Sequence, residues 1–161
     1  MMLHWSVPTS VFKLDLDPVL LNELRDVKSV MHANKDAMVD YRSLVIGEMS
    51  KKLTGQKLSD LEADIKLLIK NLLSIGAELS LAKELRDFFN DLIDKIGTKL
   101  YNMDFAQSEV EQFFAALISS IEKLAENSKA LRRNYKQTWI RFLTVVGFCL
   151  NKMYPKLIQL I

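Results

Sequence analysis

The periodicity of residues 129–161 constrains the fold of this chain more than any other feature. Apolar side chains recur there in steps of three and four residues, which places them on one face of a helix. The members of this apolar stripe are Leu131, Tyr135, Trp139, Phe142, Val146, Cys149 and Met153. Between residues 140 and 150 most other positions are apolar as well. Such a helix is buried in a bundle, contacts a partner or meets a membrane.

The same stretch is strongly basic. It contains seven Lys or Arg residues and no Asp or Glu, whereas the whole chain has 22 Lys+Arg against 20 Asp+Glu. Residues 1–128 therefore hold 15 basic against 20 acidic side chains. Five cations are candidates for contact with an anionic surface: Lys129, Arg132, Arg133, Lys136 and Arg141. Alternatively, a row of carboxylates on another helix, Asp87, Asp91 and Asp94, pairs with these cations inside the bundle.

The scarcity of turn-forming residues favours an all-α fold. The chain has five Gly and three Pro among 161 residues and is rich in Leu, Lys, Glu and Ala, which suits helices. We predict an up-and-down bundle of four to five amphipathic helices around one apolar core. Three very long helices are the alternative arrangement.

Local signals indicate where the first helices begin and end. Asp17 followed by Pro18 is typical of a helix start. The polar segment 32–36 is the point where the first helix can break, and Gly55 offers it a C-terminal cap. Residues 59–101 then form either one kinked helix or two helices that meet near Gly76.

Two capping boxes and a proline mark further boundaries. The boxes begin at Ser59 and Ser108, each with a glutamate three residues later, and each predicts a helix start. Pro155 predicts the end of the last helix, because the residue before a proline is disfavoured in helical geometry. Residues 105–153 can again be one helix or two.

Residues 1–17 follow a different pattern. Phe12, Leu14 and Leu16 alternate with charged residues, which is typical of extended chain. A lone strand is not stable by itself. We therefore expect a short extended arm over residues 1–17 and a single helical-bundle domain over residues 18–161.

The sequence offers little for catalysis. Neither of the two histidines, His4 and His32, stands in the spacing of a helical zinc or di-iron site. The glycines are isolated, so the chain lacks a phosphate-binding loop and a dinucleotide fingerprint. Cys149 has no partner cysteine and lies on the apolar stripe, which predicts a buried, unreactive thiol in a reducing compartment. We expect no enzyme activity, no cofactor and no metal ion.

Two functions fit a basic, apolar last helix without catalytic residues. The first is a non-enzymatic interaction module that binds a protein partner or a second copy of itself through its helices. The contact candidates are Ile140, Leu143, Phe148, Leu157, Leu160 and Ile161. The alternative is a helical bundle that binds anionic membrane lipid through its last helix, since cations beside an aromatic apolar face suit a membrane surface.

Other partners and locations are less favoured. The aromatic residues nearest the cations, Tyr135 and Trp139, lie on the apolar stripe, so they are not placed to stack on nucleic acid bases. The chain lacks a run of about 18 uncharged apolar residues, the length that spans a membrane, and its N-terminus does not resemble a secretory signal. We expect a cytoplasmic protein, peripheral at a membrane under the second function.

Overall fold

The computed structural model describes residues 18–51, 55–79, 85–129 and 131–160. Every regular element in these ranges is a helix, which confirms the predicted all-α class. The helices are α2 (Pro18–Ala33), α3 (Lys35–Met49), α4 (Gly55–Leu79), α5 (Leu85–Asn102), α6 (Gln107–Asn127) and α7 (Arg133–Leu160). The predicted extended arm over residues 1–17 lies outside the described residues.

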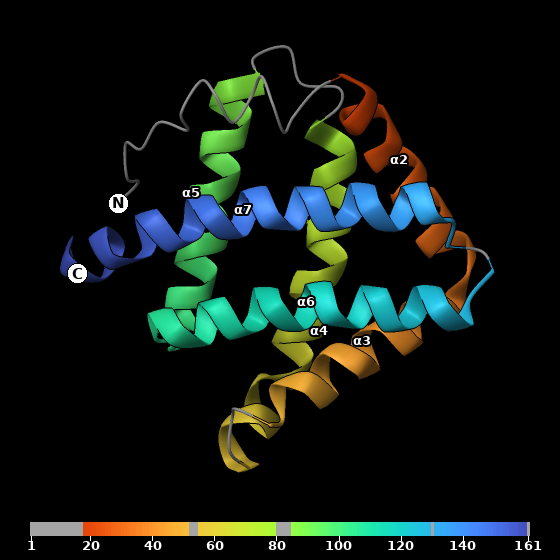
Figure 1. The fold of residues 1–161 in the computed structure, drawn as a ribbon. Helices are drawn as coiled ribbons and strands as arrows, with labels where there is room; N and C mark the ends of the chain where they lie inside the picture. The colour runs from red at the N-terminus through yellow and green to blue at the C-terminus, as the bar shows by residue number, and fades with distance from the viewer. Residues whose placement is uncertain (1–17, 52–54, 80–84, 130, 161) are drawn as a thin grey trace.

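The helices pack in crossed groups (Figure 1). α6 and α7 run side by side in opposite directions, while α4 and α5 run across them. α7 contacts α2 near its start and α5 nearer its end, and α3 packs mainly on α6. The last helix therefore touches several elements of the bundle, as its broad apolar surface requires.

One continuous apolar core joins all six helices. Its largest fully buried side chains are Trp139, Tyr41, Tyr154, Phe89, Phe113 and Phe142. The apolar stripe predicted for residues 131–153 is buried in this core, except for Tyr135, which is partly buried. The periodicity of the last helix thus identifies the face that packs inward.

A chain of buried hydrogen bonds joins α7, α3 and α6. The Trp139 indole N–H donates to the Tyr41 hydroxyl at 3.0 Å, and this hydroxyl donates to the Leu117 carbonyl at 2.9 Å. Burial raises the pKa of the Tyr41 hydroxyl well above its usual value, although the hydrogen bond from Trp139 opposes the shift. Because both polar groups are satisfied, the core can hold them and they fix how the three helices meet.

The joint between α2 and α3 confirms the predicted break in the polar segment 32–36. Asn34 has extended backbone geometry, and its side-chain Oδ1 accepts a hydrogen bond from the Ala37 N–H at 3.0 Å. This is the N-cap arrangement that starts a new helix. This break separates α2 from α3, so the described residues form six helices, one more than the upper limit of the predicted four to five.

The start of α4 differs from the prediction. We expected Gly55 to end the preceding helix and Ser59 to cap the next one, but α4 begins at Gly55 itself. The residues between them, Gln-Lys-Leu at 56–58, are good helix formers and extend the helix by about one turn. Ser59 therefore lies inside α4 and is not an N-cap.

Residues 59–101 form two helices, which settles the alternative left open above. α4 extends to Leu79 and α5 begins at Leu85, so Gly76 lies inside α4 and not between the two helices. A Cβ atom at Gly76 would lie 3.5 Å from the Cε2 atom of Phe142. A methyl group at this position would make ordinary van der Waals contact with Phe142, so the packing does not require a glycine, and Gly76 does not interrupt the helix.

The boundary between α5 and α6 lies at the predicted turn, but its capping residues differ. Asp104 has a left-handed φ of 60°, and the Phe105 N–H donates to the Leu100 carbonyl at 3.2 Å, which closes the end of α5. α6 begins at Gln107, and the Glu109 carboxylate accepts from the Ala106 N–H at 3.0 Å. The capping box expected at Ser108 is therefore wrong, because the N-cap is Ala106 and the helix starts two residues earlier.

Pro155 does not end α7, which continues to Leu160. A proline inside a helix leaves the carbonyl four residues earlier without its N–H donor, and here that carbonyl belongs to Asn151. The Gln107 side-chain amide donates to the Asn151 carbonyl at 3.3 Å and to the Asn151 Oδ1 at 2.9 Å. The buried Tyr154 hydroxyl also donates to the Phe105 carbonyl. These contacts hold the helix in place around the proline.

Replacing Gln107 by Leu should lower the free energy of unfolding by about 0.5–1.5 kcal/mol, because the Asn151 carbonyl loses its donor. In a Pro155→Ala background the same replacement should cost less, since residue 155 then supplies an N–H of its own. Urea denaturation of the four proteins in this cycle measures the coupling. Equal costs of Gln107→Leu in both backgrounds would contradict the role assigned to Gln107.

Candidate functional site

The outward side of α7 is the candidate functional site. Its exposed positions follow one another at three- and four-residue steps, and we call them the outer face of α7: Arg133, Gln137, Arg141, Thr144, Phe148 and Lys152. Phe148 is 47% exposed, whereas Trp139 and Phe142 on the same helix are buried. The outer face thus presents an aromatic ring among basic and polar side chains.

Phe148 lies between cations on the outer face of α7. The Lys152 ammonium nitrogen is 4.5 Å from the centroid of the Phe148 ring, a distance at which the cation is attracted to the ring. Arg141 lies two turns earlier on the same side of the helix and is exposed. This arrangement suits a partner that offers both an apolar contact and negative charge.

Close packing behind α7 orients this face outward. Gly147 faces α6, where an added Cβ atom would lie 3.3 Å from the Cγ atom of Phe114. Since successive helix positions are rotated by about 100°, the residue after Gly147 turns away from α6. The exposure of Phe148 is therefore a consequence of how α7 packs.

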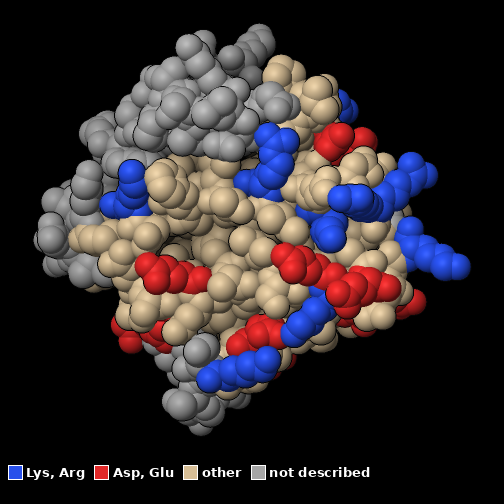
Figure 2. All heavy atoms as spheres, in the orientation of Figure 1, with Lys and Arg blue, Asp and Glu red and all other residues tan. Residues whose placement is uncertain are grey.

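The surface around α6 and α7 is divided by charge (Figure 2). Lys and Arg side chains lie along the band that α7 occupies in Figure 1, and Asp and Glu side chains gather along α6 beside it. The exposed carboxylates of α6 are Glu111, Glu122 and Glu126. A partner that covers both helices would therefore meet basic and acidic strips side by side.

The six contact candidates from the sequence have different positions. Phe148 is exposed, Ile140 is partly buried, and Leu143 is fully buried in the core. Leu143 is therefore not on a surface that a partner can reach while the chain is folded. The side chains of Leu157 and Leu160, and residue Ile161, lie outside the described residues.

Four of the five basic candidates lie at or beside the start of α7, and Arg141 lies about two turns further along the helix. We expected the last helix to open at Lys129, but α7 begins at Arg133, so Lys129 and Arg132 precede it. Lys129, Arg132, Arg133 and Arg141 are exposed, and Lys136 is partly buried. The first turn of α7 contains no acidic residue, so these cations add to the positive end of the helix dipole.

In the described part of the chain, Lys129, Arg132, Arg133 and Lys136 are not paired with the carboxylates of α5. Asp87 and Asp91 are exposed, and the described residues contain no ion pair between either of them and these cations. Asp94, the third carboxylate of this row, is 8% exposed and lies against the core. The α5 helix instead meets the later part of α7.

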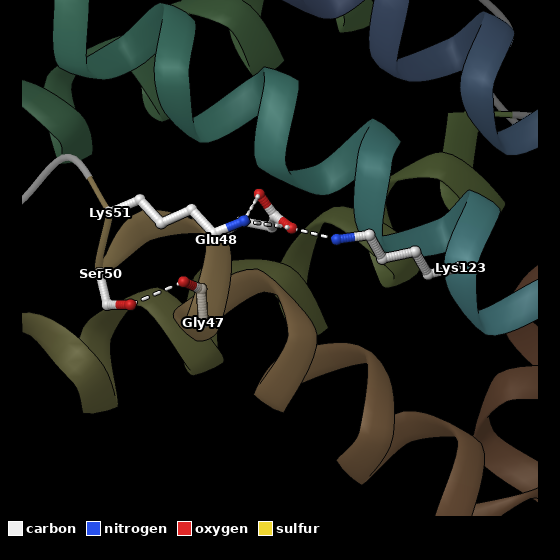
Figure 3. A network of polar contacts seen from close by, with 5 residues as sticks. All are labelled: Gly47, Glu48, Ser50, Lys51 and Lys123. Carbon is white, nitrogen blue, oxygen red and sulfur yellow. Dashed lines mark hydrogen bonds and ion pairs between the residues drawn. The ribbon is translucent and has the colours of Figure 1, made fainter.

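A polar network joins α3 to α6 (Figure 3). The Glu48 carboxylate accepts from Lys51 at 3.3 Å and also contacts Lys123 of α6, and Ser50 donates to the Gly47 carbonyl at 2.6 Å. The hydrogen bond from Lys123 is the main reason that the pKa of Glu48 lies below its usual value. Because the Glu48 carboxylate already has two ammonium partners within the described structure, we assign this network to the contact between α3 and α6.

Sequence reasoning missed a hollow at the joint between α2 and α3. It has a volume of about 310 Å³ and is lined by Met31, His32, Lys35, Met38, Val39, Arg42 and Lys70. The polar segment 32–36 was recognised as a helix break, but its side chains were not linked to Lys70. That residue comes from α4, far along the sequence, so periodicity alone gave no signal.

Cys149 should react with iodoacetamide only when the chain unfolds. The thiol is buried, as predicted, and burial raises its pKa to about 12, although nearby Lys152 opposes the shift. At about pH 8 the folded protein then holds almost no thiolate, which is the reactive form. Mass spectrometry after labelling in native buffer and in urea measures this. Equal labelling rates in the two conditions would contradict the burial.

The described residues lack both a metal-binding cluster and a membrane-spanning helix. Among the described residues, there is no cluster of three or more His, Cys, Asp or Glu side chains that could bind a metal ion. Among the described helices, none combines the length and the hydropathy needed to cross a bilayer.

Comparison with known proteins identifies relatives of this chain. The sequence profile of the acidic fibroblast growth factor binding family matches residues 1–155. Acidic fibroblast growth factor intracellular-binding protein B of Danio rerio is 28% identical over 141 residues, which are 88% of this chain and 37% of that protein. The protein named acidic fibroblast growth factor intracellular-binding protein in Homo sapiens is 29% identical over 141 residues, 88% of this chain and 36% of that protein.

The similarity covers only part of these relatives. The chain spans little more than a third of the length of the curated proteins it matches. No solved structure matches the chain.

Proposed function

Because this chain belongs to the acidic fibroblast growth factor binding family, we propose that it is a non-enzymatic helical module that binds a protein partner. The relatives are named as intracellular-binding proteins of acidic fibroblast growth factor. This growth factor is therefore the first partner to test, and a cytoplasmic location is part of the proposal. Self-association through the same surface is the alternative form of protein binding.

The observation that carries the proposal is the exposure of Phe148 on the outer face of α7. An aromatic ring that is 47% exposed and has Lys152 at 4.5 Å resembles the anchors of protein interfaces, where aromatic residues and Arg are enriched. Arg141 on the same side can add a charged contact at the edge. Gly147 packs closely on Phe114 of α6, and this contact fixes the position of the neighbouring Phe148 ring.

Isothermal titration of the 161-residue chain with acidic fibroblast growth factor tests the proposal. We expect saturable binding with a defined stoichiometry. Light scattering of the chain alone shows whether it also forms dimers. Monomeric chain that binds the growth factor supports the first form of the proposal, and a dimer without growth factor binding supports self-association. A monomer that does not bind the growth factor contradicts both.

Binding of anionic lipid is a second candidate, favoured by the cations at the start of α7. Lys129, Arg132 and Arg133 are exposed, and the described structure shows no ion pair for any of them. Each cation close to an anionic membrane contributes about 1 kcal/mol. Trp139 and Phe142 are buried in the core, so they insert into lipid only if α7 leaves the bundle.

Flotation with vesicles separates the two candidates. A lipid-binding chain should float with phosphatidylserine vesicles at low salt, not with neutral vesicles, and less at high salt, because screening weakens surface attraction. Reversing Arg132 and Arg133 to Glu should then remove most of the binding. Flotation that is unchanged by this double reversal would rule out the basic arc as the lipid contact.

A further inference from the structure

The hollow at the joint between α2 and α3 has an unusual lining. Of its seven residues, His32, Lys35, Arg42 and Lys70 are basic, and none is acidic. They come from three helices, because His32 lies in the last turn of α2, Lys35 and Arg42 belong to α3, and Lys70 belongs to α4. The break at Asn34 is what brings the first three around one opening.

These basic side chains are not neutralised inside the described structure. The described residues include no hydrogen-bond or ion-pair partner for His32, Lys35, Arg42 or Lys70. By contrast, Lys66, one turn before Lys70 on α4, pairs with Glu62 at 3.0 Å. The hollow therefore concentrates positive charge that attracts a negatively charged partner.

The remaining lining is apolar. Met31 and Met38 are buried at its base, and Val39 is 52% exposed. Methionine side chains adapt to the shape of an apolar group placed against them. The volume of about 310 Å³ lies at the lower end of the range of about 300–1,000 Å³ for ligand pockets, so it suits one or two side chains.

We propose that this hollow binds a short acidic segment of a partner protein, with an apolar side chain seated on Met31, Met38 and Val39 and carboxylates facing Lys35, Arg42 and Lys70. Charge complementarity specifies the acidic residues, and the apolar base specifies the side chain between them. A simple phosphate or a lipid headgroup would use the cations and leave the apolar base uncovered. This proposal rests on the proposed function in protein binding. The hollow is a different surface from the outer face of α7.

Selection of peptides on the intact chain tests this site without knowledge of the natural partner. A phage library of random short peptides is selected on the immobilised 161-residue protein, and enriched peptides are synthesised. We expect enrichment of sequences with several Asp or Glu around one Leu, Ile or Phe. Fluorescence anisotropy should show that the triple variant Lys35→Glu, Arg42→Glu, Lys70→Glu binds them at least about tenfold more weakly.

A matched variant separates the site from general electrostatics. Arg25→Glu, Lys95→Glu, Lys99→Glu makes the same change in net charge at exposed positions outside the hollow and should bind the peptides like the unmodified chain. Circular dichroism shows whether each variant is folded. If the triple variant does not fold, Val39→Asp, at an exposed lining position, replaces it and should also weaken binding.

Several outcomes would overturn the proposal. They are enrichment of no peptide, enrichment of peptides without acidic residues, and equal binding to the unmodified chain and the triple variant. If the unmodified chain binds anionic vesicles and the triple variant does not, the hollow binds lipid headgroups instead. If peptide binding is weakened only by Phe148→Asp, the peptides bind the outer face of α7 and not the hollow. Such a result would overturn the proposal for the hollow and leave the proposed function to be tested with the growth factor.

Discussion

Replacing Trp139 by Ala should lower the free energy of unfolding by about 3–5 kcal/mol. The indole is 1% exposed, stacks on Phe142 with a centroid distance of 5.4 Å, and donates to Tyr41 at 3.0 Å. Its removal leaves a cavity where α7 meets α3 and takes a donor from a buried hydroxyl. Because typical domains are stable by only about 5–15 kcal/mol, thermal or urea denaturation should show a large loss.

Trp139→Phe is the matched control. It keeps an aromatic ring against Phe142 but removes the N–H that Tyr41 accepts, so it should cost about half as much or less. Tyr41 still donates to the Leu117 carbonyl in both variants. A cost of less than about 1 kcal/mol for Trp139→Ala would mean that the indole is outside the core and α7 is placed differently.

Replacing Phe148 by Asp should weaken binding of the proposed protein partner at least about thirtyfold, since central aromatic anchors contribute about 2 kcal/mol or more. The change removes the exposed ring and its contact with Lys152. The fold should remain intact, because the introduced carboxylate lies one turn before Lys152 and can pair with it. Titration calorimetry measures the affinity, and thermal denaturation confirms folding.

Val19→Asp is the control for this binding prediction. Val19 is 67% exposed on α2, so the change adds the same charge at an exposed apolar position on another helix. It should leave the affinity within about twofold. Equal losses of affinity in the two variants would show that net charge, and not Phe148, decides binding.

The sequence was sufficient to predict how the last helix packs. Its apolar stripe is buried, and the exposed position of Phe148 lies off that stripe. The break in the polar segment 32–36 was also predictable, because Asn34 is a strong N-cap residue. These features depend on residues near one another in the sequence, where periodicity and capping preferences act.

The features that could not be predicted depend on contacts between distant residues. Pro155 remains helical because Gln107, on another helix, supplies a donor to the Asn151 carbonyl. Leu143 looked available for a partner, but its side of α7 is covered by the bundle. The basic hollow likewise needs Lys70 to lie beside the joint of α2 and α3. None of these contacts leaves a periodic signal in the sequence.

Hydroxyl-radical footprinting of Phe148 tests the central claim most directly. In the chain alone the exposed ring should be oxidised readily, while the buried Trp139 and Phe142 on the same helix should be protected. In the complex with the proposed protein partner, oxidation of Phe148 should fall sharply, because an anchor at the centre of an interface is excluded from water. Unchanged oxidation of Phe148 in a saturated complex would contradict the claim that the partner binds the outer face of α7.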